Sequence, residues 1–187
     1  MQREILAERT ECCPVGIPLP RILGREIVSL SSHNIMKGYM KKILFVCLGN
    51  ICRSPMAEFV MKRLVEEAGR AGEFEIASAA TSTEELGNPV YPPARRKMAE
   101  HGISCKGKTA RQITMRDYGY YDLIIGMDSS NLRNMHRFFG GDPEGKISLR
   151  LDYTSRPGDV ADPWYTGNFD ATWRDCMEGC TGLLKTL

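Results

Sequence analysis

A cysteine and an arginine separated by five residues lie in the segment Cys-Leu-Gly-Asn-Ile-Cys-Arg-Ser, residues 47–54. This segment follows the apolar run 43–46 and precedes a helical pattern, so it should join a strand end to a helix N-terminus. Backbone N–H groups and the helix dipole attract a phosphate oxyanion at such a junction. Arg53 adds a planar fork suited to two phosphoryl oxygens. We therefore expect the Cys47 thiol to ionise more readily than a free cysteine and to attack a bound phosphate.

Small and polar residues in and after this segment support that interpretation. Gly49 allows a left-handed turn, and Asn50 tolerates the same conformation. Ser54 is predicted to cap the following helix, with Pro55 at its first position. The simpler alternative, a buried strand-end thiol beside a surface arginine, does not explain this combination.

A second motif, Asp162-Pro163-Trp164-Tyr165, lies far downstream. When a thiolate attacks phosphorus, a departing phenolate needs a proton, and Asp162 is a candidate general acid. Pro163 fixes the backbone after it, while Trp164 and Tyr165 offer flat apolar walls for an aromatic ring. Taken alone, Asp-Pro more simply indicates a turn. The cysteine segment upstream favours the general acid.

These two motifs resemble those of the low-molecular-weight protein tyrosine phosphatase family. Residues 46–55 match its opening signature, Val-Cys-x-Gly-Asn-x-Cys-Arg-Ser-Pro, and residues 162–165 match its later Asp-Pro followed by two aromatics. The resemblance extends from about Lys42 to the C-terminus. It implies hydrolysis of phosphotyrosine proteins or peptides through a cysteinyl-phosphate intermediate, with Asp162 as general acid and neither a metal nor another cofactor.

The resemblance also implies a set of phosphate-binding and supporting residues: Leu48, Gly49, Asn50, Ile51, Cys52, Ser54, Ser78 and His101. Ser54 would donate its hydroxyl to Cys47, and Ser78 and His101 would hydrogen-bond the loop and Asn50. For His101, an interaction with the dipole of its own helix is an equal alternative.

Two further positions follow from the resemblance. Cys52 could trap an oxidised Cys47 as a reversible disulfide, or it could simply fill space under the loop. Glu84, Trp164 and Tyr165 are the expected substrate-lining residues. Glu84 departs from the family pattern, because many members carry an aromatic wall in the corresponding loop. Peptide preference is therefore expected to differ here.

Composition indicates an ordinary globular chain of 187 residues, 42% hydrophobic and 26% charged, with a net charge of +2. Its basic residues form no stripe, and no apolar run is long enough to span a membrane, so neither nucleic acid nor a membrane is an expected partner. The seven cysteines follow no zinc-ligand spacing. Because a working thiolate needs a reducing compartment, we expect a cytoplasmic protein. Cys176 and Cys180 are expected to be buried as small hydrophobes.

The order of elements predicts a single α/β domain over residues 40–187, with a four-stranded parallel sheet flanked by helices on both faces. The predicted strands cover 43–46, 74–77, 123–127 and 147–151. The predicted helices cover 54–68, 92–101, 129–139 and 169–187. Residues 1–39 lack this pattern and are expected to be a poorly ordered extension or a mis-assigned start.

Three other functions compete with a tyrosine phosphatase. A thioredoxin-coupled arsenate reductase of similar fold needs a redox cysteine pair near residues 123–143, which contain no cysteine. A phosphocarrier module would require neither Arg53 nor Asp162. Specificity for phosphoarginine is a feature of similar proteins that carry threonine at the position of Ile51. The bulkier, branched Ile51 therefore favours phosphotyrosine as the substrate. The sequence identifies neither the physiological substrate nor the oligomeric state.

Overall fold

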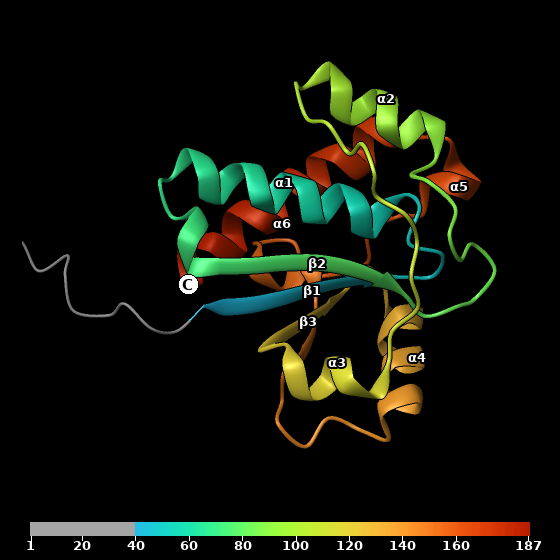
Figure 1. Ribbon diagram of the computed structural model, residues 1–187, viewed down its shortest axis with the longest axis vertical. Helices are drawn as coiled ribbons and strands as arrows, with labels where there is room; N and C mark the ends of the chain where they lie inside the picture. The colour runs from blue at the N-terminus through green and yellow to red at the C-terminus, as the bar shows by residue number, and fades with distance from the viewer. Residues whose placement is uncertain (1–39) are drawn as a thin grey trace, which may run out of the picture. The chain divides into compact units, whose positions relative to one another are not determined.

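The computed structural model describes residues 40–187, and the predicted extension 1–39 lies outside the described residues. Four parallel strands form one sheet in the order β2-β1-β3-β4 (Figure 1). Their bounds are β1 Lys41–Cys47, β2 Phe74–Ala80, β3 Leu123–Gly126 and β4 Ile147–Leu149. The predicted α/β fold with a four-stranded parallel sheet is confirmed.

Helices cover both faces of the sheet (Figure 1). One face carries α1 (Arg53–Glu67), α2 (Pro92–Glu100) and α6 (Phe169–Thr186), and α1 packs against both β2 and α6. The other face carries α3 (Met115–Tyr120) and α4 (Ser129–Phe139). The short helix α5 (Pro163–Thr166) and the 3-10 turns 71–73 and 150–153 complete the described elements.

The central strand β1 is buried on both sides, as its continuous apolar run predicted. Ile43 and Phe45 join the core under α1 and α6, while Leu44 and Val46 join the core under α3 and α4. All four side chains are fully buried. Alternate side chains of a strand point to opposite faces, so each face of β1 meets its own layer of helices.

The sequence predicted the long elements better than the short ones. Strand β2 runs three residues beyond the predicted end at position 77, and β4 ends at Leu149, where the chain enters a 3-10 turn. Helices α3 and α5, of 6 and 4 residues, were not predicted. A helix of one or two turns is too short to show a helical period in its apolar residues.

The strand order places a change of direction beside β1. The chain moves from β1 to β2 on one side and then crosses to β3 and β4 on the other. In open parallel sheets of this kind, ligands bind beyond the carboxyl ends of the strands at such a switch point. Cys47, the last residue of β1, lies there.

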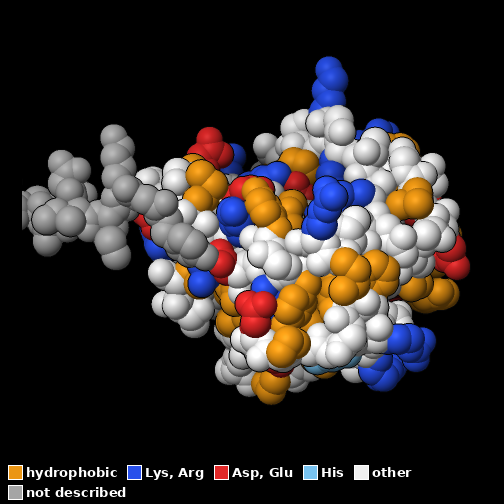
Figure 2. Space-filling view, turned by 60° about the horizontal axis from the view of Figure 1, so that its bottom comes forward, with side chains coloured by type: hydrophobic (Ala, Val, Ile, Leu, Met, Phe, Trp, Pro, Cys, Tyr) orange, Lys and Arg blue, Asp and Glu red, His pale blue; other side chains and the backbone are white. Residues whose placement is uncertain are grey.

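Two observations bear on the surface of the described part of the chain. Between residues 40 and 187, no helix is both long and apolar enough to cross a bilayer. Figure 2 shows basic and acidic side chains interspersed with apolar ones on the face in view.

Candidate active site

The segment after β1 folds as a tight loop that leads into α1. Asn50 takes up the left-handed conformation, with φ of 58°, whereas Gly49 does not. The prediction that Gly49 serves a left-handed turn is therefore wrong. A larger residue at position 49 would crowd Glu85, because its Cβ would lie 3.1 Å from Cγ of that side chain.

Hydrogen bonds from outside the loop fix the direction of its peptide groups. Three loop carbonyls accept a bond of 2.9 Å each: Cys47 from Thr81 N–H, Leu48 from Ser82 N–H, and Ile51 from Tyr91 N–H. In a trans peptide the next N–H points the opposite way from the carbonyl. The N–H groups of Leu48, Gly49 and Cys52 therefore face away from these contacts, as an anion cradle requires.

The Cys47 sulfur receives support from two polar groups. Its Sγ lies 3.0 Å from Oγ of Ser54 and accepts a bond of 3.3 Å from the Asn50 N–H. Ser54 Oγ also accepts from Asn50 Nδ2 and lies 3.4 Å from the Ala79 carbonyl, so its hydroxyl proton can point at that carbonyl or at the sulfur. Helix α1 begins at Arg53 with Cys52 at its N-cap, so the predicted capping role of Ser54 is wrong.

Asn50 is a buried hub that fixes the loop. Its Nδ2 donates to Oγ of both Ser54 and Ser78 at 2.8 Å, and its Oδ1 accepts from the Arg111 N–H at 3.2 Å. The side chain is almost completely buried. Satisfying both ends of the amide offsets the cost of the left-handed backbone. Ser78 therefore contacts the side chain of Asn50 directly.

The buried ion pair between Glu58 and Lys108, behind Ser78, was not predicted from the sequence. Oε2 of Glu58 accepts from Ser78 Oγ at 2.6 Å and lies 2.8 Å from Lys108 Nζ, which also donates to the Ser78 carbonyl. Burial alone would raise the pKa of Glu58, but Lys108, helped by hydrogen bonds from Lys62 and Ser78, holds that pKa below its usual range. The sequence shows only a glutamate in the first turns of α1, and glutamates are common at surface positions of helices, so nothing marked Glu58 as buried.

His101 does not contact the phosphate loop, and the implied supporting role is wrong. The residue is exposed at the C-terminal end of α2, where its ring stacks on Trp173 with centroids 4.0 Å apart. Helix α2 packs on α6, the helix that carries Trp173. Lys108 provides the cationic support next to Ser78 instead.

The Arg53 guanidinium is buried and joins three segments of chain. Its Nη1 lies 2.5 Å from Oδ2 of Asp128 and 3.2 Å from the Val160 carbonyl, and its Nη2 bonds Oδ2 of Asp162. Burial by itself would lower the pKa of Arg53, but Cys47, Asp128 and Asp162 outweigh it and raise that pKa. Asp128 also caps α4 through Asn131 N–H, so both of its oxygens are engaged.

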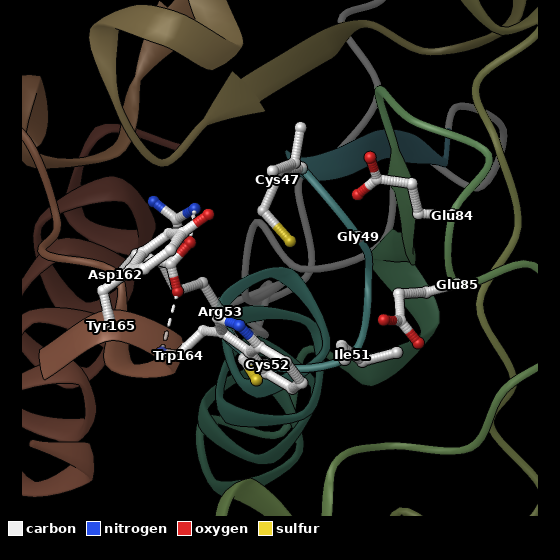
Figure 3. A pocket seen from close by; sticks show the side chains of 11 residues that line it. Cys47, Gly49, Ile51, Cys52, Arg53, Glu84, Glu85, Asp162, Trp164 and Tyr165 are labelled. Carbon is white, nitrogen blue, oxygen red and sulfur yellow. Dashed lines mark hydrogen bonds and ion pairs between the residues drawn. The ribbon is translucent and has the colours of Figure 1, made fainter. Parts of the chain in front are cut away.

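A pocket of about 130 Å³ opens above the cysteine. Figure 3 shows Cys47 between two walls, one carrying Asp162, Trp164 and Tyr165 and the other carrying Glu84 and Glu85. The lining also includes the predicted loop residues Leu48, Gly49, Ile51 and Cys52, together with Arg53.

The aromatic wall is partly anchored and partly free. The Trp164 ring packs on Tyr91 with centroids 4.9 Å apart, whereas Tyr165 is 78% exposed. The Asp162 carboxylate caps α5 through the Trp164 N–H at 3.0 Å, which aims its second oxygen into the pocket toward Arg53. An aromatic ring entering between the walls would place its phosphate on the loop.

Cys52 is buried beside the pocket. Burial raises the pKa of its thiol strongly, and Cys47 and Asp162 raise it further. Cys176 and Cys180 are fully buried, as predicted. Within the described range, no group of three His, Cys, Asp or Glu side chains could hold a metal ion.

A buried thiol, a buried arginine and a carboxylic acid around one small pocket at a strand end define an α/β phosphomonoester hydrolase. The profile described as low molecular weight phosphotyrosine protein phosphatase matches residues 42–187. The chain belongs to this family, whose members hydrolyse phosphotyrosine.

Individual relatives agree with that assignment. The chain is 38% identical over 150 residues to the low molecular weight protein-tyrosine-phosphatase YfkJ of Bacillus subtilis, covering 79% of this chain and 96% of that one. The Rattus norvegicus low molecular weight phosphotyrosine protein phosphatase is 39% identical over 150 residues, covering 78% and 94%. The YfkJ crystal structure has a TM-score of 0.78 at 37% identity over 81% and 96% of the chains. SP-PTP of Streptococcus pyogenes has a TM-score of 0.72 at 42% identity over 79% and 93%.

The Glu58–Lys108 pair gives a testable prediction about stability. Its side chains are 5% and 13% exposed, so Lys108→Met should leave a carboxylate buried with only Lys62 nearby. We expect a loss of about 2–4 kcal/mol in the free energy of unfolding, measured by urea denaturation at neutral pH. The matched control Lys146→Met, whose partner Glu144 is exposed, should lose only about 1 kcal/mol.

The pH dependence of this loss follows from the pKa of Glu58. In the unaltered protein that pKa is lowered, so the charged form stabilises the fold above the unfolded-state pKa and loses this effect as the pH falls through the folded-state pKa. In Lys108→Met the effect of Lys108 is lost and only the bonds from Lys62 and Ser78 oppose burial, so the charged form of Glu58 stabilises the fold less and its protonation costs less stability. The gap between the two proteins should narrow from about pH 7 to about pH 4. A gap of constant size would contradict the assignment.

Proposed function

We propose that the protein hydrolyses phosphotyrosine in proteins or peptides through a cysteinyl-phosphate intermediate formed on Cys47. The observation that carries this proposal is the Cys47 sulfur at the base of the pocket, 3.0 Å from Ser54 Oγ and 3.3 Å from the Asn50 nitrogen. Both groups can donate a hydrogen bond to the Cys47 thiolate, and the same bonds stabilise it when it leaves the cysteinyl phosphate in the second step. Arg53 and Asp162 line the same pocket.

The reaction proceeds in two displacements at phosphorus. The Cys47 thiolate forms the S–P bond as the P–O bond to tyrosine breaks, and Asp162 gives its proton to the departing phenolic oxygen. Asp162, now the carboxylate, then takes a proton from the water that attacks the cysteinyl phosphate. This second step breaks the S–P bond and returns the thiolate. Arg53 and the loop N–H groups hold the phosphoryl oxygens throughout.

We also propose a cytoplasmic location, because a catalytic thiolate survives only in a reducing compartment. The cysteines of the described residues are all free in the structure: Cys47, Cys52, Cys105, Cys176 and Cys180. The two remaining cysteines of the sequence, Cys12 and Cys13, lie outside those residues.

The role of Asp162 is tested by Asp162→Asn, which removes the acid but keeps an oxygen that can cap α5. We expect the turnover of phosphotyrosine to fall roughly 10²–10³-fold, since its phenolic leaving group needs the proton. An aryl phosphate with an acidic phenol should lose less than about tenfold and show a burst of phenol, because the phosphoenzyme accumulates.

The control for this variant is Asp159→Asn. Asp159 is exposed and accepts from the Ser129 N–H at 2.8 Å, outside the pocket. It should retain near-normal rates on both substrates. Equal losses on both substrates for Asp162→Asn would mean that Asp162 only shapes the loop and that the general acid is another group.

A further inference from the structure

The second wall of the pocket is acidic and has no cationic partner among the described residues. Glu84 is exposed and Glu85 is half-buried, and both line the pocket opposite the aromatic wall (Figure 3). Among residues 40–187, no Lys or Arg forms an ion pair with either carboxylate. Two negative charges therefore stand at the rim of a site that must admit a phosphate dianion.

Glu85 is held beside the phosphate loop by a hydrogen bond: its Oε2 accepts from Asn88 Nδ2 at 2.7 Å. Its Cγ also lies close to Gly49, where an added Cβ would be only 3.1 Å away. Turning the carboxylate away from the loop would break the bond to Asn88. Its neighbour Glu84 adds a second charge on the same side of the opening.

This arrangement repels phosphate unless something cationic arrives with it. Like charges a few ångströms apart disfavour one another, and the effect is strongest where solvent is partly excluded. The pocket supplies Arg53 on the opposite side, where it is already paired with Asp128 and Asp162. A cation for the acidic wall is therefore expected from the substrate.

We infer that Glu84 and Glu85 select phosphotyrosine peptides that carry a lysine or arginine within two positions of the phosphotyrosine. This inference rests on the proposed function. An extended peptide advances about 3.3 Å per residue, so a basic side chain one or two positions away reaches the rim when phosphotyrosine fills the pocket. Rim charges of this kind contribute mainly to selectivity and to the rate of association.

The test compares three peptides that differ only beside phosphotyrosine: lysine, glutamine or glutamate on both sides. For the unaltered protein we expect kcat/KM to be roughly threefold to tenfold higher for the lysine peptide than for the glutamine peptide, and lowest for the glutamate peptide. The preference should shrink in high salt, which screens exposed charges. In the double variant Glu84→Gln/Glu85→Gln, the three values should converge.

Glu66→Gln is the matched control. It removes one exposed carboxylate near the C-terminal end of α1, at the opposite end of that helix from the phosphate loop, and it should keep the lysine preference. Glutamine is close in shape to glutamate, so in Glu85→Gln the side-chain amide oxygen can still accept from Asn88. Both variants are assayed as the full chain.

A small aryl phosphate separates failure of this inference from failure of the proposed function. If the protein hydrolyses it in a Cys47-dependent way but treats the three peptides alike, the inference is overturned and the phosphatase proposal stands. If neither the aryl phosphate nor any peptide is hydrolysed, both are overturned. Faster hydrolysis of a phosphoarginine peptide than of all three phosphotyrosine peptides would also overturn the inference, because the acidic wall would then pair with the substrate guanidinium inside the pocket.

Discussion

Cys47→Ser should reduce the turnover of phosphotyrosine by at least about four orders of magnitude, because a hydroxyl remains protonated at neutral pH and is a far weaker nucleophile. Inorganic phosphate and a phosphotyrosine peptide should still bind, since the loop amides and Arg53 are retained. Serine is also small enough to keep the contact with Ser54, which lies 3.0 Å from the sulfur. Rapid-quench assays and calorimetric binding measure the two effects separately.

The matched control for this prediction is Cys105→Ser. Cys105 is likewise buried, and burial raises the pKa of its thiol, but it lies outside the catalytic pocket. Its replacement should leave the rate nearly unchanged. More than a trace of activity in a clean preparation of Cys47→Ser would rule out a covalent intermediate on this residue, and loss of phosphate binding would show that the sulfur itself holds the loop.

Arg53→Lys should lose nearly as much activity as Arg53→Ala, roughly 10²–10³-fold or more in kcat. The guanidinium contacts Asp128, Asp162 and the Val160 carbonyl at once, and a planar fork is required to do so while still facing the pocket. An ammonium group is a point charge and cannot reproduce this geometry. Steady-state kinetics of the two variants on one aryl phosphate make the comparison.

Arg111→Lys is the control for the general effect of replacing a guanidinium by an ammonium group. Arg111 pairs with Asp117 through two bonds of 3.0 and 3.1 Å outside the pocket, and only its backbone N–H touches Asn50. This variant should lose some stability but little activity. A near-normal rate for Arg53→Lys would show that positive charge alone suffices, and the bidentate role of Arg53 would have to be abandoned.

The parts of this protein that depend on neighbouring residues could be predicted from the sequence. The four strands and the long helices follow from apolar runs and helical periodicity, and the sheet confirms them. The phosphate-binding character of segment 47–54 was also predictable, because its backbone N–H groups, its arginine and the start of the helix all belong to the same short segment. The motif beginning at Asp162 is local in the same way, because the capping of α5 involves only adjacent residues.

Tertiary structure alone decided which distant groups meet at the pocket. Arg53 contacts Asp128 and Asp162 from 75 and 109 positions away. Asp128 is near because β3, which precedes it, lies beside β1, and Asp162 is near because the Val160 N–H bonds the Met127 carbonyl just after β3. Periodicity shows that a strand exists but not which strand lies beside it.

The folded structure also decided that Lys108, and not His101, lies next to Ser78. Both residues follow α2 closely in sequence, yet the histidine stacks on Trp173 of α6 while the lysine reaches buried Glu58. The direction in which the chain leaves the helix determines which of them is buried. A buried carboxylate must find a cation, and that partner is chosen by proximity in the folded protein and not by spacing along the chain.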